Sequence, residues 1–185
     1  MTPAAPASTA SAISHDELQA LCARSIRIMA DGDLSDFEAV VHPEARNREA
    51  AAEPPATRGT GPAAFYATAL WLRSAYADLH WEIHDMAADG DLVVAHATMS
   101  GRQVRTFVGY GPDGAPAQAF PALNRTFATT QTHWLRVADG KVIEHWANRD
   151  DLGTAAQLGW APPSPAYVFK MKLALRQARR QARQR

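Results

Sequence analysis

The sequence predicts an α+β fold, with helices packed on one face of a curved antiparallel sheet. Two observations predict this class. Apolar residues recur at helical spacing in the first part of the chain, and alternating β-forming segments separated by hairpin turns follow them. The chain has 185 residues, 46% of them hydrophobic and 21% charged, as in an ordinary globular protein. Its length predicts one domain of roughly 150 residues with an extension at each end.

Two helices are predicted near the N-terminus. Ser14 and Glu17 have the spacing of a capping box, in which each side chain satisfies a free backbone amide at a helix start. Apolar residues at helical spacing then predict a helix over residues 15–30. A shorter helix over residues 34–41 ends before His42-Pro43, because a residue that precedes proline is pushed out of the α region.

A loop and a third helix follow. Residues 44–60 contain two prolines and several small residues, and we interpret them as a loop. Thr60-Gly61-Pro62 predicts the start of the next helix, because proline at the first helical position loses no hydrogen bond. The apolar face of that helix would carry Phe65, Ala69, Leu72 and Tyr76.

The remaining pattern is that of strands joined by tight turns. Asp89-Gly90 and Asp139-Gly140 each separate two segments of β-forming residues, as in hairpins. Strands are predicted over residues 79–86, 92–102, 106–110, 127–137 and 141–148. A short helix over residues 151–158 and a helical tail over 166–185 complete the chain.

The zero net charge hides an asymmetry along the chain. Residues 170–185 hold seven basic residues and no acid, which leaves 12 basic against 19 acidic residues, a net charge of −7, in the rest. An acidic body disfavours nucleic-acid binding, which depends on neutralising phosphates. We interpret the basic tail (residues 161–185) as a helix that is solvated or docked on the body, and an RNA or anionic-lipid contact as the weaker alternative.

Membrane and secretory classes are disfavoured. No apolar run approaches the roughly 18 residues that span a bilayer, so no membrane partner is expected. Residues 1–14 lack the basic and apolar regions of a secretory signal, and we expect a disordered extension there. The one cysteine, Cys22, forms no internal disulfide. These features predict a cytoplasmic protein.

Most motifs of cofactor chemistry are absent. The sequence has no GxGxxG after a strand, no GxxxxGK[ST], no HExxH and no GxSxG, and its Cys and His residues lack zinc spacing. Nicotinamide, ATP and serine-hydrolase chemistry are therefore disfavoured, and neither a cofactor nor a metal is expected.

Polar residues interrupt one face of the strand over residues 127–137. Alternation places Phe127, Gln131 and His133 together, and Trp134 on the opposite face. If the first face lies under the helices, two polar side chains point into an apolar pocket, which is the usual form of a small-molecule site. The alternative for His133 is a core histidine bonded to a neighbour.

Two carboxylates follow the last strand. Asp150 and Asp151 come where the chain leaves the sheet, a position at which a partly buried carboxylate can act as a general base. Asp151 is the expected cap of the following helix. For Asp150, a place facing the pocket and an ion pair with an arginine remain equal alternatives.

Several segments together resemble the SnoaL-like polyketide cyclases, also called ester cyclases, of the NTF2-like superfamily. The resemblance covers residues 15–160 and rests on the run THWLRVADGKVIEHW from Thr132 to Trp146, on Gln157-Leu158-Gly159, on His42-Pro43-Glu44 followed by Asn47, and on Gly59-x-Gly61-Pro62. It implies a cone-shaped barrel with a deep apolar cavity. It also implies a homodimer or homotetramer formed through the open sheet face, where Trp134 is our candidate contact.

The resemblance also implies roles for individual residues. In these cyclases an aspartate removes a proton from an activated carbon and an intramolecular aldol reaction closes a ring, while a histidine and an asparagine bind carbonyl oxygens. The histidine corresponds to His133 and the asparagine to Asn47. The usual aspartate position falls on Ala147, so Asp150 is the candidate base. Tyr66, Phe127, Gln131, His145 and Ala147 are the other expected substrate contacts.

The chain departs from the family in three further places. Residues 104–124 are longer than the usual loop, and their aromatic residues are expected to form a lid. The usual Pro-Thr-Gly turn is replaced by Ala122-Leu123-Asn124-Arg125, and the tail beyond residue 165 is an addition.

Two function classes compete. The first is a cofactor-independent acid–base enzyme that acts on a hydrophobic, carbonyl-bearing small molecule by aldol-type cyclisation or isomerisation, with a hydrolase or hydratase as a variant. The second is a non-catalytic small-molecule binding protein, which Ala147 favours. Fold resemblance alone does not decide between them, since function depends on the site.

Overall fold

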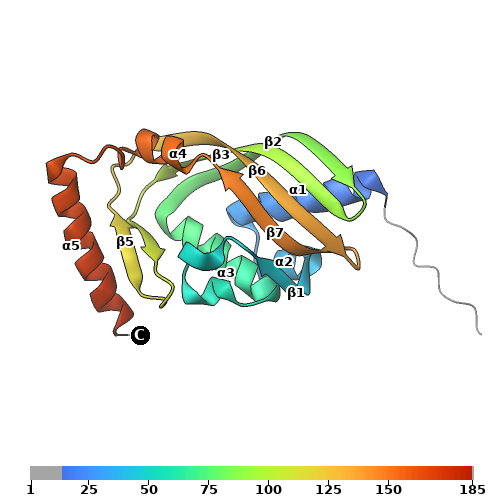
Figure 1. Cartoon of the computed structure of the whole chain (residues 1–185), viewed down its shortest axis with the longest axis horizontal. Coiled ribbons are helices and arrows are strands. Elements are labelled where there is room, and N and C mark those ends of the chain that lie inside the picture. Colours follow the sequence, from blue (N-terminus) through green and yellow to red (C-terminus); the bar gives the residue numbers. More distant parts are fainter. Residues whose placement is uncertain (1–13, 185) are drawn as a thin grey trace, which may run out of the picture.

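The computed structural model describes residues 14–184, and the expected N-terminal extension lies outside these residues apart from Ser14. Three helices lie along one face of a strongly curved five-stranded sheet (Figure 1): α1 (His15–Asp31), α2 (Leu34–Val40) and α3 (Gly61–Ala75). The strand order is β1 (Val41–Asn47), β7 (Lys141–Arg149), β6 (Thr126–Ala138), β3 (Leu92–Gln103) and β2 (Tyr76–Asp89). The predicted α+β class is confirmed.

Local sequence features start the helices where they were expected. Ser14 and Glu17 form the reciprocal capping box at α1. Asp33 and Asp36 form a second box at α2. Helices α4 (Asp151–Leu158) and α5 (Pro165–Ala182) lie where the sequence predicted them. None of the helices among residues 14–184 combines the length and hydropathy needed to cross a membrane.

One strand of the sheet was missed, because residues 44–47 were predicted as loop. They belong to β1, which runs parallel to β7, whereas all other strand pairs in this sheet are antiparallel. The segment has no alternating pattern, and its proline, Pro43, is tolerated because β1 is an edge strand. Pairing with β7, rather than local sequence, makes β1 a strand.

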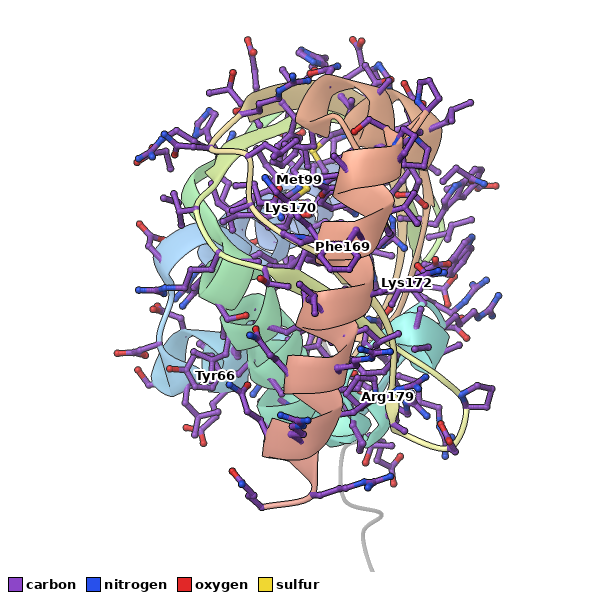
Figure 2. All side chains as sticks on the ribbon, turned by 90° about the vertical axis from the view of Figure 1, so that its left-hand side faces the viewer. Tyr66, Met99, Phe169, Lys170, Lys172 and Arg179 are labelled. Carbon is purple, nitrogen blue, oxygen red and sulfur yellow. The ribbon has the colours of Figure 1, made fainter. Side chains whose placement is uncertain are left out.

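The predicted lid over residues 104–124 is a small hairpin. Strand β4 (Phe107–Tyr110) pairs with β5 (Pro116–Phe120), a strand that was not predicted. Helix α5 crosses this hairpin at one end of the molecule (Figures 1 and 2). The Tyr167 hydroxyl donates to the Pro121 carbonyl at 2.9 Å, and Arg179 Nε donates to the Pro116 carbonyl at 3.0 Å. The tail is therefore a helix docked on the body, as one alternative predicted.

The core fills the space between the helices and the sheet. Leu18 and Cys22 of α1 pack with Val93 and Leu135 from the central strands. A second cluster, built around Phe37, joins α2, α3 and the start of β1. Together the two clusters hold the helices against the concave sheet.

Gly61 sits where β1 and the start of α3 come closest. Its φ is 79°, and a Cβ added there would lie 2.5 Å from the Pro43 carbonyl oxygen. Gly140 has a similar φ of 70° but open space around it. Substitutions at Gly61 and Gly140 therefore separate two contributions to the free energy of unfolding, that of a left-handed backbone and that of steric crowding.

We expect Gly61→Ala to lower the free energy of unfolding more than Gly140→Ala does. The second change costs only the roughly 1–2 kcal/mol of a left-handed alanine, whereas the first must also move β1 from α3. Urea unfolding followed by tryptophan fluorescence measures both. Equal losses in the two variants would contradict the close approach at Gly61.

Candidate active site

A cavity of about 410 Å³ opens between the helices and the concave face of the sheet. Helices α1 and α3, the strands, the β4–β5 hairpin and α4 all contribute to its wall. The wall is largely apolar and includes Phe65, Leu72, Tyr76, Trp81, Met99, Phe107, Phe120, Phe127, Leu135 and Trp160. Its size and lining are those of a small-molecule site.

Stacked aromatic rings form part of the cavity wall. The Trp160 ring stacks on Phe120 at a centroid distance of 4.3 Å and on Phe107 at 5.6 Å. Trp160 Nε1 donates to the Gln103 side-chain oxygen at 3.2 Å. Phe107 and Phe120 of the hairpin are therefore part of a packed wall.

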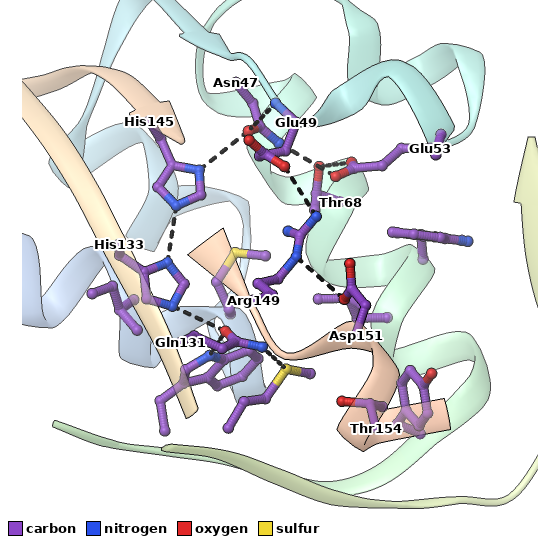
Figure 3. Close-up of a pocket in the computed structure, with 18 of the residues that line it drawn as sticks. Asn47, Glu49, Glu53, Thr68, Gln131, His133, His145, Arg149, Asp151 and Thr154 are labelled. Atoms are coloured by element: carbon purple, nitrogen blue, oxygen red, sulfur yellow. Dashed lines mark hydrogen bonds and ion pairs between the residues drawn. The ribbon is translucent and has the colours of Figure 1, made fainter. Parts of the chain in front are cut away.

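A line of polar side chains crosses the apolar wall (Figure 3). Gln131 and His133 point inward from β6, His145 from β7, and Asn47 from the end of β1. The inward face of β6 follows the period of two in its sequence, since Thr129, Gln131 and His133 are all buried. Pairing with β7 brings His145 beside them.

Contacts of hydrogen-bond length connect these four side chains in sequence. His133 Nε2 lies 3.0 Å from Gln131 Oε1, and His133 Nδ1 lies 3.0 Å from His145 Nε2. His145 Nδ1 lies 3.2 Å from Asn47 Oδ1. Each imidazole nitrogen of what we call the histidine pair, His133 and His145, therefore lies within 3.2 Å of another polar atom.

A buried carboxyl group lies behind Asn47. Glu53 is 4% exposed, accepts from Thr68 Oγ1 at 2.6 Å and from Asn47 Nδ2 at 3.4 Å. Burial raises the pKa of Glu53, against the lowering effect of these hydrogen bonds and of the more distant Arg149 charge. Glu53 reaches the histidine pair only through the Asn47 amide.

Arg149 brings a positive charge to the same cavity. It forms ion pairs with Glu49 at 3.1 Å and with Asp151 at 3.8 Å (Figure 3). Burial first, and the Arg149 charge second, lower the pKa of His133 to about 4. The pKa of His145 is also well below its usual value, through burial first and then through His133 and Arg149. Both imidazoles are therefore neutral at pH 7.

Asp150 is not in the cavity. Its carboxylate is exposed and accepts the Gly153 amide at 2.7 Å, so Asp150 is the N-cap of α4. The expectation of a pocket-facing Asp150 was therefore wrong. The expectation that Asp151 caps this helix was also wrong, because Asp150 is the cap. Asp151 lines the cavity instead. Because His145 and Arg149 face inward on β7, the next side chain, Asp150, turns away from them.

The other expected contacts divide into two groups. Asn47, Gln131, His133, Phe127 and His145 line the cavity. Tyr66 does not, because it packs on Phe37 at a ring distance of 5.5 Å in the second core cluster. Ala147 pairs directly with His133 in the sheet but is absent from the lining.

Sequence analysis missed several polar residues of the cavity. Glu49 and Glu53 lie in the segment predicted as loop, where no periodicity shows which way a side chain points. Arg149 is different, because extending the alternation from His145 by two steps of two residues would have placed it inward. Among residues 14–184 no group of three or more His, Cys, Asp or Glu side chains is arranged to hold a metal ion.

Comparison with known proteins gives one family and several relatives. Residues 20–158 match the family model described as SnoaL-like polyketide cyclase. The chain is 33% identical over 146 residues to aklanonic acid methyl ester cyclase DnrD of Streptomyces peucetius, covering 78% of this chain and 92% of the relative. It is 30% identical over 133 residues to nogalonic acid methyl ester cyclase of Streptomyces nogalater, covering 69% and 87%.

Solved structures show the same architecture. TsrD from Streptomyces laurentii superposes with a TM-score of 0.63 at 28% identity, covering 79% of this chain and 97% of that one. An NTF2-like protein from Burkholderia thailandensis superposes with a TM-score of 0.52 at 18% identity, covering 76% and 95%. The fold is therefore NTF2-like.

The neutral histidines predict a loss of stability in acid. Histidine in the unfolded chain has a pKa near 6.5, so it becomes protonated below that pH. In the folded chain His133 and His145 stay neutral down to their lowered pKa values. We therefore expect the free energy of unfolding to decrease as the pH is lowered from about 6 to about 4.5, by up to about 1.4 kcal/mol per pH unit for each buried imidazole. Glu53, with its raised pKa, acts in the opposite direction.

Urea unfolding at a series of pH values measures this dependence. His133→Gln should flatten it, whereas the matched change His80→Gln, at an exposed histidine of β2, should leave it as it is. An unchanged slope in His133→Gln would show that His133 is not held neutral by the fold.

Proposed function

Since this chain belongs to the SnoaL-like polyketide cyclase family, we propose that it catalyses a cofactor-independent acid–base cyclisation of a hydrophobic, carbonyl-bearing polyketide inside the cavity. One observation carries the proposal: two neutral imidazoles face each other in an apolar wall, with His133 Nδ1 3.0 Å from His145 Nε2. A neutral imidazole accepts a proton, and a water-poor cavity keeps a carbanion from being quenched by solvent.

The proposed reaction is an intramolecular aldol addition. A base removes a proton from a carbon activated by neighbouring carbonyl groups, and the electron pair becomes an enolate. The enolate carbon attacks a second carbonyl carbon of the same molecule, and the resulting alkoxide takes a proton back. Polyketide methyl esters, of the kind in the names of the two relatives, are the first candidate substrates.

Gln131 supplies a donor for the enolate oxygen. Within residues 14–184, its Nε2 atom bonds only the Met99 thioether sulfur, at 3.1 Å. Because a thioether is a weak acceptor, a substrate oxygen can take this hydrogen bond at small cost. Gln131 Oε1 is already held by the His133 and Trp81 ring nitrogens, which orient the amide.

Ala147 favours a second candidate function. A methyl group stands opposite His133, where the family's aspartate is expected. A protein that binds the same hydrophobic carbonyl compounds without converting them is therefore the alternative to the cyclase.

Conversion of a named compound separates the two functions. We expect the protein to cyclise aklanonic acid methyl ester or nogalonic acid methyl ester, seen by liquid chromatography as a product of unchanged mass and altered retention. His133→Gln should slow this by about 10²–10⁴-fold, the usual contribution of acid–base groups, and His80→Gln should not. Saturable binding of both esters without any product would support the carrier function.

We extend the proposal to self-association through the outer face of the sheet. Trp134 and Trp146 stack there at 5.9 Å, and the Arg48 guanidinium lies 4.4 Å from the Trp146 ring centre. A second copy covering these rings would bury aromatic surface typical of interfaces. Trp134→Glu should reduce the mass measured by sedimentation, and a mass equal to the monomer in the unchanged protein would refute this contact.

A further inference from the structure

We propose that the histidine pair itself is the base of the reaction, in place of the carboxylate missing at position 147, and that the abstracted proton is held between His133 Nδ1 and His145 Nε2. This inference rests on the proposed function, because it names the group that takes the substrate proton. It makes His145 a catalytic residue as well as a lining residue.

The register of the sheet shows how His145 takes the place of a carboxylate at position 147 as the neighbour of His133. Ala147 of β7 stands directly opposite His133 of β6, so a carboxylate at 147 would be the natural neighbour of this imidazole. With a methyl group there, the imidazole of His145, two residues earlier on the same face, reaches His133 at 3.0 Å. The contact that His133 lacks from position 147 is thus made by a second base.

Both ends of the hydrogen-bonded line are fixed as acceptors. Asn47 Oδ1 accepts the Glu49 amide at 3.1 Å, and Asn47 Nδ2 donates to Glu53, so the amide cannot be reversed without losing both bonds. Gln131 Oε1 accepts from Trp81 Nε1 at 3.4 Å, and an indole nitrogen only donates. His145 Nδ1 and His133 Nε2 must therefore each carry a hydrogen.

Counting the hydrogens on the ring nitrogens then shows which two nitrogens carry none. Two neutral imidazoles have two N–H groups, and the amide oxygens at the two ends use both. His133 Nδ1 and His145 Nε2 are left with lone pairs facing each other across 3.0 Å. A third proton placed between them replaces a repulsion by a charge-assisted hydrogen bond and completes the network.

The step is balanced without any further reactant. The substrate C–H bond breaks, its electron pair stays on the substrate as the enolate, and the proton forms an N–H bond within the pair. After carbon–carbon bond formation the same proton passes to the alkoxide oxygen, and the pair returns to its neutral state. No oxidant, reductant or metal is consumed.

The charged groups around the pair are consistent with a neutral resting state. Arg149 of β7 opposes protonation, but its charge is shared with Glu49 and Asp151. Glu53 lies beyond Asn47, and in the described part of the chain the sides of the cavity formed by α1, α3, β2 and β3 present no charged side chain. Because burial lowers the pKa of His133 to about 4 and lowers that of His145 as well, the resting pair carries no charge at pH 7.

The other carboxylates of the cavity are already committed. Glu49 and Asp151 are paired with Arg149, and both oxygens of Glu53 accept hydrogen bonds. A proton transferred to Glu49 or Asp151 would weaken the ion pair of that carboxylate with Arg149. A proton placed within the histidine pair instead adds a hydrogen bond.

Nitrogen-15 NMR of histidine-labelled protein tests the proton count without any substrate. At pH 7 we expect the Nδ1–H form of His145 and the Nε2–H form of His133. On acidification the pair should take up one proton as a unit, with a low-field N–H···N signal that His145→Gln abolishes. The same tautomer at both residues, or two independent titrations, would overturn the inference.

A residue exchange tests the catalytic role. His145→Gln keeps a hydrogen-bonding side chain but removes the second base, and it should lower kcat for whichever ester the protein cyclises by about 10²–10⁴-fold. Adding Ala147→Asp to that variant should recover at least about tenfold of the loss, because a carboxylate then stands opposite His133. His80→Gln is the matched control and should keep the original rate.

The outcomes separate the two levels of the proposal. Absence of turnover in the unchanged protein overturns the proposed function, and the assignment of a base with it. Turnover that survives in His145→Gln, or that Ala147→Asp fails to recover, overturns only the role of the pair. In the second case Glu53→Gln identifies the remaining buried carboxyl as the base if it abolishes the activity.

Discussion

The pairing register of β6 and β7 is the constraint on which the site depends. It sets Ala147 opposite His133 and lets His145 reach the same imidazole from two residues away. Because side chains alternate along a strand, a slip of one residue would send the inward residues of β7 to the outer face. The hairpin turn at Asp139-Gly140 and the burial of Leu135 and Val142 hold this register.

The same geometry explains why polar chemistry persists inside an apolar wall. A buried polar group is costly unless it is hydrogen-bonded, and each imidazole of the line from Gln131 to Asn47 donates to an amide oxygen at one end. The neutral pair lacks one proton for complete satisfaction. In this structure the position where the network is least satisfied is the position where a substrate proton would be accepted.

Sequence reasoning succeeded where a local rule was sufficient. The capping box at Ser14 and the alternation of residues 127–137 placed α1 and the inward face of β6 correctly. It was wrong for Asp150, because a carboxylate at a strand end is compatible with both a site and a helix cap, and the Gly153 amide decides for the cap. It also missed β1, whose pairing with β7 joins segments about 100 residues apart.

By itself the sequence determined the class of fold, the order of the elements other than β1 and β5, and which residues of β6 face inward, because these depend on periods of 3.6 and 2 and on residues close in the chain. Only the tertiary structure decided which polar groups meet. The contact of His145 with Asn47 crosses 98 positions, and the entry of Glu53 and Arg149 into the cavity depends on how β1, α3 and α4 pack around it. Such contacts depend on how segments far apart in the chain pack together, and local sequence patterns contain no information about that packing.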